Sequence, residues 1–352
     1  MKSEAHINRI GTAVPPHDAH QPYLRWAERH LRDRRDHALF ARMASRSGIA
    51  RRYSVLAPPT PDGSQTDPGG FYGGDAMPST ARRMAVYAEA APELCLAAVD
   101  SLGRPDGITH LVLASCTGFV APGIDQIVAE RLGLAASVER TLVGFMGCYA
   151  AVAALRTARH IVRSDPQARV LVITVELCSL HLQPAGDLES ILAGMLFGDG
   201  AAAALVSADR DGLTMTAPFA ERLPDSDGLI GWTIGDTGFV MHLSGAVPGR
   251  IGQALATPRF RALIGDPAEV DGWAVHAGGR SVLDAVEHAL ELDKKALDHS
   301  RAVLHDNGNM SSTTLMFVLA RLIEERRRVE NGIAIAFGPG LAAEGFRFGS
   351  PS

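Results

Sequence analysis

The chain has 352 residues, which is long enough to bury more than one conventional core, so two similar halves or one large α/β body are both open. Hydrophobic residues make up 46% and charged residues 21%, ordinary values for a soluble globular protein. The formal net charge of −5 is small for this length, which argues against a nucleic-acid-binding protein.

The sequence shows no sign of a targeting or membrane-spanning segment. Residues 1–20 lack the apolar core of a signal peptide, and no stretch approaches the roughly 18 uninterrupted apolar residues that would span a bilayer. We therefore expect a cytoplasmic protein without a membrane span.

The cysteines and histidines form no metal-binding pattern. The 13 histidines include no H-E-x-x-H motif, and the cysteines are scattered without a C-x-x-C pair. We expect neither a metal site nor a disulfide framework in a chain of this size. The cysteines are Cys95, Cys116, Cys148 and Cys178.

In the first part of the chain, short apolar runs alternate with helical patterns, as in parallel strands joined by helical crossovers. Residues 108–116 read as a buried strand and 123–134 as a helix, and further strands are predicted at 168–177 and 198–209. Before them, residues 57–79 are rich in Pro, Gly, Ser and Asp, which predicts a long surface loop and makes a lid one interpretation of it.

After Gly212 the same pattern starts again. A strand at 271–279 leads into a helix at 280–292, and a helix at 311–328 is followed by a buried strand at 331–340. We therefore predict a duplicated five-layer α/β fold with halves 1–210 and 211–352. Their strand and helix ends would meet at the junction, where α/β folds usually bind ligands.

Cys148 lies where an apolar run meets Gly147 and a helix begins. A lone cysteine is most often a small core residue. At a helix N-terminus, however, the free backbone N–H groups lower the pKa of a thiol and offer an oxyanion site. The apolar first turns and a later stripe of Arg156, Arg159 and Arg163 predict a helix that starts buried and ends at the surface.

A nucleophilic thiol needs a base or a cation nearby, and the second half offers two partners. His276 ends the strand in "GWAVHAGG", and Asn309 lies in "DNGNMSSTT", just before a helix that Ser311 or Ser312 could cap. Each residue alone is more often structural. The combination predicts a thiol, imidazole and amide site.

Four ordered motifs, "GFMGCYAA", "GWAVHAGG", "VLHDNGNMSS" and "AFGPG", closely resemble those of the type III polyketide synthases, the chalcone-synthase-like branch of the thiolase superfamily. The similarity runs from about residue 7 to the C-terminus and points to the bacterial type. It implies a homodimer with a thiolase-like αβαβα fold. It also implies that Cys148 accepts the acyl group, that His276 is its partner and that Asn309 is a second donor to the thioester carbonyl.

The resemblance further implies a substrate cavity and a CoA site. Phe197 matches a gatekeeping phenylalanine, Met241 replaces the second gatekeeper, and Ala121 replaces a bulkier methionine, which would favour an aliphatic acyl starter. Arg42 and Arg46 match CoA-binding positions, although Leu39 stands where a lysine is common. Acyl-CoA and malonyl-CoA would be the substrates, with no cofactor. The other expected cavity residues are Cys116, Thr117, Cys178, Ser311, Gly338 and Pro339.

The expected reaction is decarboxylative condensation of malonyl-CoA onto a Cys148-bound acyl group, followed by cyclisation to a pyrone, resorcinol or phloroglucinol-type product. Two other enzymes stay open: a ketoacyl-ACP synthase III-like enzyme that condenses once, and a malonyl-primed tetrahydroxynaphthalene synthase. A catalytically inactive binding scaffold is the alternative outside enzymes. A degradative thiolase would need a second catalytic cysteine near the C-terminus, whereas the last cysteine here is Cys178.

Overall fold

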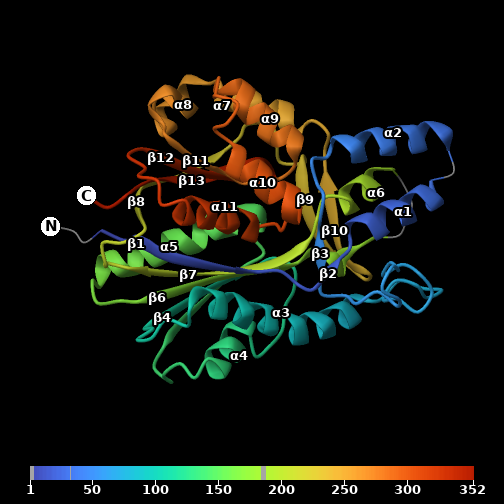
Figure 1. The fold of residues 1–352 in the computed structure, drawn as a ribbon, viewed down its shortest axis with the longest axis horizontal. Coiled ribbons are helices and arrows are strands. Elements are labelled where there is room, and N and C mark those ends of the chain that lie inside the picture. Colours follow the sequence, from blue (N-terminus) through green and yellow to red (C-terminus); the bar gives the residue numbers. More distant parts are fainter. Residues whose placement is uncertain (1–3, 32, 184–187) are drawn as a thin grey trace.

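The computed structural model describes residues 4–31, 33–183 and 188–352. Helices and half-sheets alternate in five layers, as the sequence predicts (Figure 1). From one side to the other, the order is α3 and α4, the N-terminal half-sheet, α5 with α11, the C-terminal half-sheet, and a layer that includes α7 and α9.

The N-terminal half-sheet has the order β5-β4-β6-β7-β1. β6 carries the sequence VLVITVEL, in which every residue is buried, because helices cover both faces of the sheet. The helix α3 begins where the Ser79 hydroxyl accepts a bond from the Arg82 N–H, and it ends at Gly103 in the left-handed conformation. The elements are β1 (His6–Ala13), α3 (Thr80–Leu102), β4 (His110–Ser115), α4 (Ile124–Arg131), β5 (Glu139–Gly144), α5 (Ala150–Ser164), β6 (Val170–Leu177) and β7 (Asp199–Ser207).

The C-terminal half-sheet has the order β8-β13-β12-β11 and joins the first half through a short antiparallel contact between β8 and β1. The parallel pair β11 and β12 repeats the arrangement of β4 and β6. The elements are β8 (Leu213–Arg222), α7 (Val247–Leu255), α8 (Pro258–Ile264), β11 (Gly272–Val275), α9 (Arg280–Ala289), α10 (Asp298–Asn307), α11 (Thr313–Glu324), β12 (Gly332–Gly338) and β13 (Ala342–Gly349).

The central core lies between the two half-sheets and is built around α5 and α11. The first part of α5 is buried on all sides. In α11, eight of the nine residues from Thr313 to Arg321 are buried. Because both helices start near the same end of the sheets, the residues just before them are brought to one place (Figure 1).

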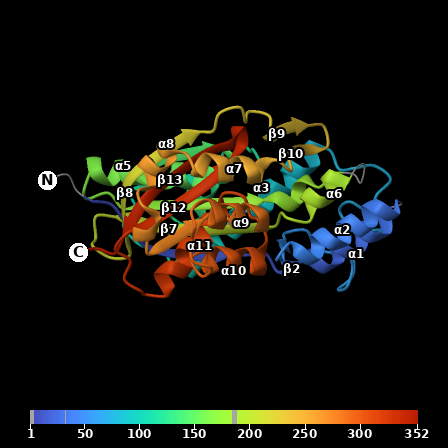
Figure 2. The ribbon, with the colours of Figure 1, turned by 90° about the horizontal axis from the view of Figure 1, so that it is seen from above.

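Smaller elements gather at the end of the molecule where the site lies. Figures 1 and 2 both place α1 and α2 there, next to α6. The hairpin of β9 and β10 also lies at this end. These elements are β2 (His17–Asp18), α1 (His20–His30), α2 (Arg34–Arg46), β3 (Tyr53–Ser54), α6 (Leu188–Gly194), β9 (Ile230–Gly235) and β10 (Gly238–Leu243).

The predicted loop 57–79 has no helix or strand, but it is anchored rather than free at the surface. Tyr72 is 6% exposed and its hydroxyl donates to the Ser179 carbonyl. Gln65 lines the cavity described below, so this loop forms part of the cavity wall.

Two details of the local predictions are wrong, although α5 does start buried and end at the exposed Ser164, as predicted. Arg159 is buried and donates to the Met215 carbonyl, and Arg156 pairs with Glu344 at 2.9 Å, because α5 runs between the two halves and its polar side faces the C-terminal half. Ser312 is the residue before α11, but no side chain caps this helix; the Ser312 hydroxyl donates to Glu176 instead.

Within the described residues, no helix is both long and apolar enough to cross a membrane. In the same ranges, no group of three or more His, Cys, Asp or Glu side chains is arranged to hold a metal ion.

Candidate active site

Cys148 lies in a short 3-10 turn, Gly147–Tyr149, immediately before α5. Gly147 has a φ of +78°, and a Cβ atom there would lie 2.3 Å from Cδ of Pro339. Only glycine fits such a left-handed position against a neighbouring ring. The turn that carries the thiol is therefore shaped by the "AFGPG" loop of the other half.

A chain of contacts joins the three predicted catalytic residues. The Ser311 hydroxyl lies 3.7 Å from Cys148 Sγ, and the Ser311 N–H donates to Asn309 Oδ1 at 2.8 Å. Asn309 Nδ2 donates to the Gly278 carbonyl at 3.1 Å. The Gly278 N–H donates to the His276 carbonyl at 3.0 Å, so the histidine is joined to this series through its backbone.

His276 follows β11 and is 1% exposed, yet neither of its ring nitrogens has a hydrogen-bond partner. Buried polar atoms normally have partners, so an unpartnered imidazole marks a place where a ligand or water would bind. Burial lowers the pKa of His276 to about 4, because the charged imidazolium would be desolvated. The ring is therefore neutral at pH 7.

The pKa of Cys148 is raised to about 11, opposite in direction to the sequence prediction. Burial is the main cause, and it outweighs the hydrogen bond from Ser311 and the helix N-terminus, which favour the thiolate. Without substrate the site therefore holds a neutral thiol and a neutral imidazole rather than an ion pair.

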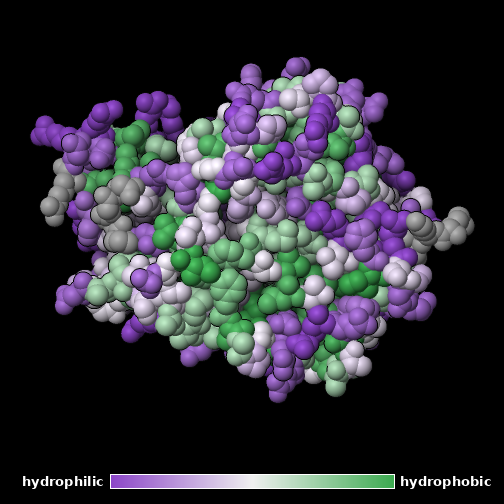
Figure 3. Space-filling model, turned by 180° about the vertical axis from the view of Figure 1, so that it is seen from behind, coloured by the Kyte–Doolittle hydropathy of each residue, from purple (hydrophilic) through white to green (hydrophobic). Residues whose placement is uncertain are grey.

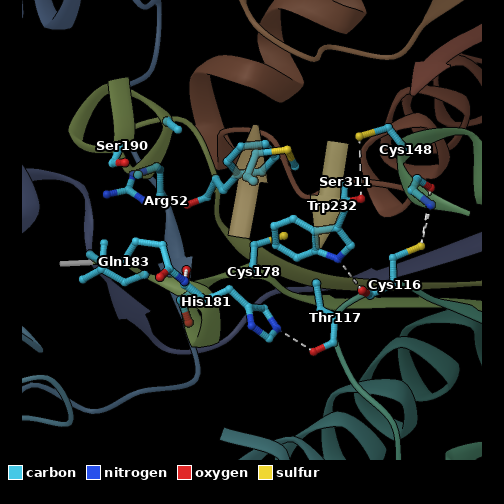
Figure 4. A pocket seen from close by; sticks show the side chains of 18 of the residues that line it. Arg52, Cys116, Thr117, Cys148, Cys178, His181, Gln183, Ser190, Trp232 and Ser311 are labelled. Carbon is cyan, nitrogen blue, oxygen red and sulfur yellow. Dashed lines mark hydrogen bonds between the residues drawn. The ribbon is translucent and has the colours of Figure 1, made fainter. Parts of the chain in front are cut away.

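A cavity with about 1030 Å³ of space, including its open part, leads away from Cys148 (Figure 4). Of the residues predicted to contact substrate, those that line it are Cys116, Thr117, Cys178, Phe197, Met241, Ser311 and Pro339. Phe197 lies beside the backbone of Asn309, because the Gly198 N–H donates to the Asn309 carbonyl and the Asn309 N–H donates to the Leu196 carbonyl.

Six predicted site residues do not line the cavity: His276 and Asn309, which were placed above, and four others. Gly338 lies against the backbone of Cys148, where a Cβ atom would be 3.3 Å from the Cys148 nitrogen. Ala121 is exposed in the loop before α4 and does not line the cavity of its own chain. Arg42 and Arg46 are exposed on α2, and Arg280 donates to the Arg46 carbonyl at 3.4 Å.

Glu176 is a site residue that sequence reasoning missed. It is fully buried at the end of β6 and accepts hydrogen bonds from the Cys116 N–H, the Thr117 hydroxyl and the Ser312 hydroxyl. Burial raises its pKa to about 7. An acidic residue ending a buried apolar strand was the signal that could have identified it.

Trp232 and His181 were also missed, although both line the cavity. The Trp232 indole N–H donates to the Cys116 carbonyl at 2.9 Å, and the two rings meet edge to face with centroids 5.4 Å apart. No motif marks either residue, because a tryptophan or histidine in a loop or hairpin has many other uses.

Arg52 is a further cavity residue that the sequence did not reveal. It is 5% exposed, its guanidinium lies over the Tyr23 ring, and it donates to His20 Nδ1 at 3.1 Å and to the Phe197 carbonyl. Burial lowers the pKa of Arg52 to about 10, which leaves it cationic at pH 7.

Two α/β halves that meet at a buried thiol, with an imidazole and an amide supplied by the second half, define the thiolase-like class of fold. Solved structures agree with this assignment. A polyketide synthase of the brown alga Ectocarpus siliculosus, PKS-I, superposes with a TM-score of 0.87 at 27% identity over 99% of both chains. The predicted fold class is confirmed.

The chain belongs to the chalcone and stilbene synthase family, the type III polyketide synthases. The family model "Chalcone and stilbene synthases, N-terminal domain" matches residues 1–210, and the corresponding C-terminal model matches residues 215–350. This confirms the family recognised from the four motifs.

Named relatives come from bacteria and plants. The "Alpha-pyrone synthesis polyketide synthase-like Pks18" of Mycobacterium tuberculosis is 34% identical over 70% of this chain, a match that spans 66% of that relative's length. The "1,3,6,8-tetrahydroxynaphthalene synthase" of Streptomyces peucetius is 34% identical over 96% of this chain and 91% of its own. The "Bisdemethoxycurcumin synthase" of rice is 34% identical over 97% and 91%.

Proposed function

We propose that this protein is an acyltransferase, a type III polyketide synthase that extends an acyl group on Cys148 with units from malonyl-CoA. The observation that carries the proposal is the unpartnered, buried imidazole of His276, two residues from Gly278, together with the contacts that run from the Gly278 carbonyl through Asn309 and Ser311 to the Cys148 thiol. CoA thioesters are substrates, and the chemistry requires no cofactor.

Loading begins with a proton transfer. The Cys148 thiol gives its proton to a ring nitrogen of His276 while the sulfur attacks the acyl-CoA carbonyl carbon. When the bond between the acyl carbon and the CoA sulfur breaks, the departing sulfur takes this proton and an acyl-enzyme remains. The neutral imidazole implied by its lowered pKa is the form that can accept the proton.

Extension uses the same two residues as donors. Malonyl-CoA loses CO2, and the electron pair of the broken C–C bond becomes an enolate whose oxygen accepts bonds from a His276 N–H and from Asn309. The Asn309 amide is already oriented, because Oδ1 accepts from Ser311 and one hydrogen of Nδ2 is directed at Gly278. The enolate carbon attacks the acyl-enzyme, and the Cys148 thiolate leaves.

Mass spectrometry tests this proposal directly. Incubation with a panel of acyl-CoA starters and malonyl-CoA should give an acyl adduct on Cys148 and products lengthened by two-carbon units. Cys148→Ala should remove the adduct, whereas Cys95→Ala, at a buried thiol in α3 remote from the cavity, should keep it. A wild-type protein that never forms an adduct would contradict the proposal.

The starter can also be malonyl-CoA itself. The similarity to a tetrahydroxynaphthalene synthase across nearly the whole chain favours this second candidate. A product that forms from malonyl-CoA alone, in the same yield with and without other starters, would identify it. A single condensation on an acyl carrier protein would instead support the ketoacyl-ACP synthase alternative.

We also propose that two copies pair through one apolar face. β5 is the edge strand of the sheet and almost all of its residues are exposed. Leu142 on β5 is 48% exposed, and Phe119, in the loop that contains Ala121, is 46% exposed. Figure 3 shows apolar side chains gathered on the face seen from behind. An unpaired edge beside such side chains is suited to pairing with a second copy.

The mass of the particle in solution tests the dimer. Light scattering should give about twice the protomer mass of 37.3 kDa, and Leu142→Arg should shift it toward one protomer. Leu39→Arg is the control, because Leu39 is similarly exposed, at 40%, but lies on α2. A Leu142→Arg protein that stays dimeric would show that this face is not the interface.

The CoA phosphates are proposed to bind at Arg42 and Arg46. Both are exposed on α2, which lies at the end of the molecule that also holds the cavity residues Ala19 and Tyr23 (Figure 2). Replacing both arginines with alanine should raise KM for malonyl-CoA and leave kcat largely unchanged.

A further inference from the structure

We infer that Arg52 is a positioning residue for Asn309, because its side chain holds the short backbone pairing that fixes where the Asn309 amide points. The inference rests on the proposed function and deepens it. It names a residue on which the extension step depends, although this residue lies away from the reacting sulfur.

The backbone of Asn309 pairs with the segment that carries Phe197. The Gly198 N–H donates to the Asn309 carbonyl at 3.0 Å, and the Asn309 N–H donates to the Leu196 carbonyl at 2.8 Å. These two bonds form an isolated parallel bridge between Phe197 and Asn309, outside the strands of the sheets. The geometry of the bridge therefore depends on what packs around it.

The Arg52 guanidinium bonds to the outer side of this bridge. The bridge uses groups from the residues on either side of Phe197, so the Phe197 carbonyl itself is directed away from Asn309. Nη1 of Arg52 donates to this carbonyl, and Nε of Arg52 donates to His20 Nδ1 at 3.1 Å. The guanidinium carbon lies over the Tyr23 ring, 4.9 Å from its centroid. Two bonds from a rigid planar group fix the Phe197 carbonyl in place.

The stem of Arg52 lies against both sides of the bridge. A Cβ atom on Gly308 would lie 2.9 Å from Arg52 Cγ, and a Cβ atom on Gly198 would lie 3.4 Å from Arg52 Cβ. One of these glycines precedes Asn309 and the other follows Phe197, and Gly308 has a φ of +69°. Glycine permits this close approach of the stem to the backbone. A change at Arg52 therefore reaches the residue next to Asn309.

The segment around Arg52 is also tied to α10, the helix that leads into the Asn309 turn. The Ala50 and Arg51 N–H groups both donate to the His305 carbonyl, at 2.8 and 3.2 Å, in the last turn of this helix. The arginine is thus anchored before the turn and bonded to the segment that pairs with it.

Arg52 influences the reaction through Asn309 rather than through the sulfur. Figure 4 shows Arg52 and Cys148 on opposite sides of the cavity. One Nδ2 hydrogen of Asn309 is directed at Gly278, and the other is the proposed donor to the enolate oxygen. Because a displacement of about 1 Å can cost about 100-fold in rate, the place of this amide is a sensitive point.

The experiment measures loading and extension separately. Arg52→Met keeps an unbranched stem against the glycines and removes both guanidinium hydrogen bonds. Release of labelled CO2, when preloaded acyl-enzyme meets malonyl-CoA, should slow roughly 10- to 100-fold. Formation of the acyl adduct should stay within about threefold of wild type, because the proposed loading step uses only Cys148 and His276.

Two further variants test the geometry. Arg52→Lys should be nearly as slow in extension as Arg52→Met, because an ammonium group keeps the charge but lacks the planar fork. Arg51→Met is the matched control and should extend at the wild-type rate, because Arg51 is exposed and lies outside the cavity wall. An Arg52→Lys protein as fast as wild type would overturn the inference.

A double-mutant cycle separates positioning from a general loss of structure. In an Asn309→Ala background, Arg52→Met should change the extension rate by less than about twofold, because the amide that Arg52 positions is already absent. Effects that multiply would show that Arg52 acts independently of Asn309. Equal losses in loading and extension would show a general structural role. Either result contradicts the inference.

The wild-type protein separates this inference from the proposed function. A wild-type protein that forms no acyl adduct contradicts the proposed function. If wild type loads and extends, and Arg52→Met extends equally fast, the inference alone is wrong. If Arg52→Met does not fold, Arg52→Lys, which keeps the long stem and the charge, takes its place in the kinetics and in the cycle.

Discussion

The two helices of the middle layer begin in similar surroundings but deliver different chemistry. α5 follows a turn that contains Gly147 at φ +78° and carries a thiol. α11 follows a turn in which Gly308 has φ +69° and Ser311 has φ +48°, and it carries an amide. Neither helix has a side-chain cap. The duplicated fold thus supplies two similar positions, and in the proposed mechanism the side chains placed there divide the work between nucleophile and donor.

The halves also differ in how their polar groups are satisfied. Near α5, the Glu176 and Cys116 side chains are hydrogen-bonded to neighbouring groups, whereas in the second half the ring nitrogens of His276 have no partner. The first half is therefore a rigid holder for the sulfur. The second half leaves the His276 imidazole free for substrate.

The largest effect is expected from removing the imidazole of His276 in the second half. His276→Ala should lower kcat/KM by roughly 10³- to 10⁴-fold, because the imidazole both accepts the thiol proton and donates to the enolate. Single-turnover kinetics of loading and extension would measure it. A loss confined to loading would mean that Asn309 alone stabilises the enolate. Arg301→Ala, at an ion pair on α10, serves as a control for the purified protein.

The ionisation of the Cys148 thiol, in the first half, can be measured through its rate of alkylation. Because the pKa of Cys148 is raised to about 11, the thiolate fraction should rise about tenfold per pH unit. The rate of modification by iodoacetamide, read at Cys148 by peptide mass, should therefore increase roughly 100-fold from pH 7 to pH 9. A rate that is already level at neutral pH would instead reveal a preformed thiolate and imidazolium pair.

The contact between the halves should respond to one added methyl group. Gly147→Ala places a Cβ at a left-handed position, against the Pro339 ring, and should reduce the free energy of unfolding by about 2–3 kcal/mol. Denaturant titration measures the change. Gly133→Ala is the control for the backbone conformation alone, since Gly133 also has a positive φ but no atom lies within 4 Å of its Cβ position. Equal losses in the two variants would show that the Pro339 contact contributes nothing.

The smallest expected effect is the pH dependence that Glu176 gives to the free energy of unfolding. Its folded pKa of about 7 lies above the ordinary 4.5, so the folded state binds the proton more tightly and stability falls as pH rises between these values. The slope is at most about 1.4 kcal/mol per pH unit. Glu176→Gln should flatten unfolding free energies measured between pH 5 and 7. An unchanged slope would assign the pH dependence to other groups.

The sequence predicts the fold, and it singles out Cys148, His276 and Asn309 as the proposed catalytic residues, because all of these are marked locally. Glycine and short strands identify the turns before Cys148 and after Val275, and four motifs fix the family. The pKa of Cys148 could not be read in the same way, because it depends on how deeply both halves bury the sulfur. Trp232, His181 and Arg52 were missed for a related reason: segments far apart in the chain bring them to one cavity, and none follows a strand or helix signal.

Ala121 shows the limit of transferring a position by resemblance. Its residue type was read as enlarging the cavity, but the loop that carries it turns outward and leaves the side chain exposed. The effect of Ala121 on substrate therefore depends on what packs against its loop, and the sequence of one chain does not specify this.

The contact between Gly147 and Pro339 has a consequence for synthesis on the ribosome. Residue 148 emerges long before residues 336–340, so the nascent first half lacks the ring against which its sulfur-bearing turn is shaped. The proposed reactivity of Cys148 toward thioesters would then arise only after residues 336–340 have been synthesised. A truncated product would carry the cysteine without the means to use it, and release of an unfinished chain would not release a working catalyst.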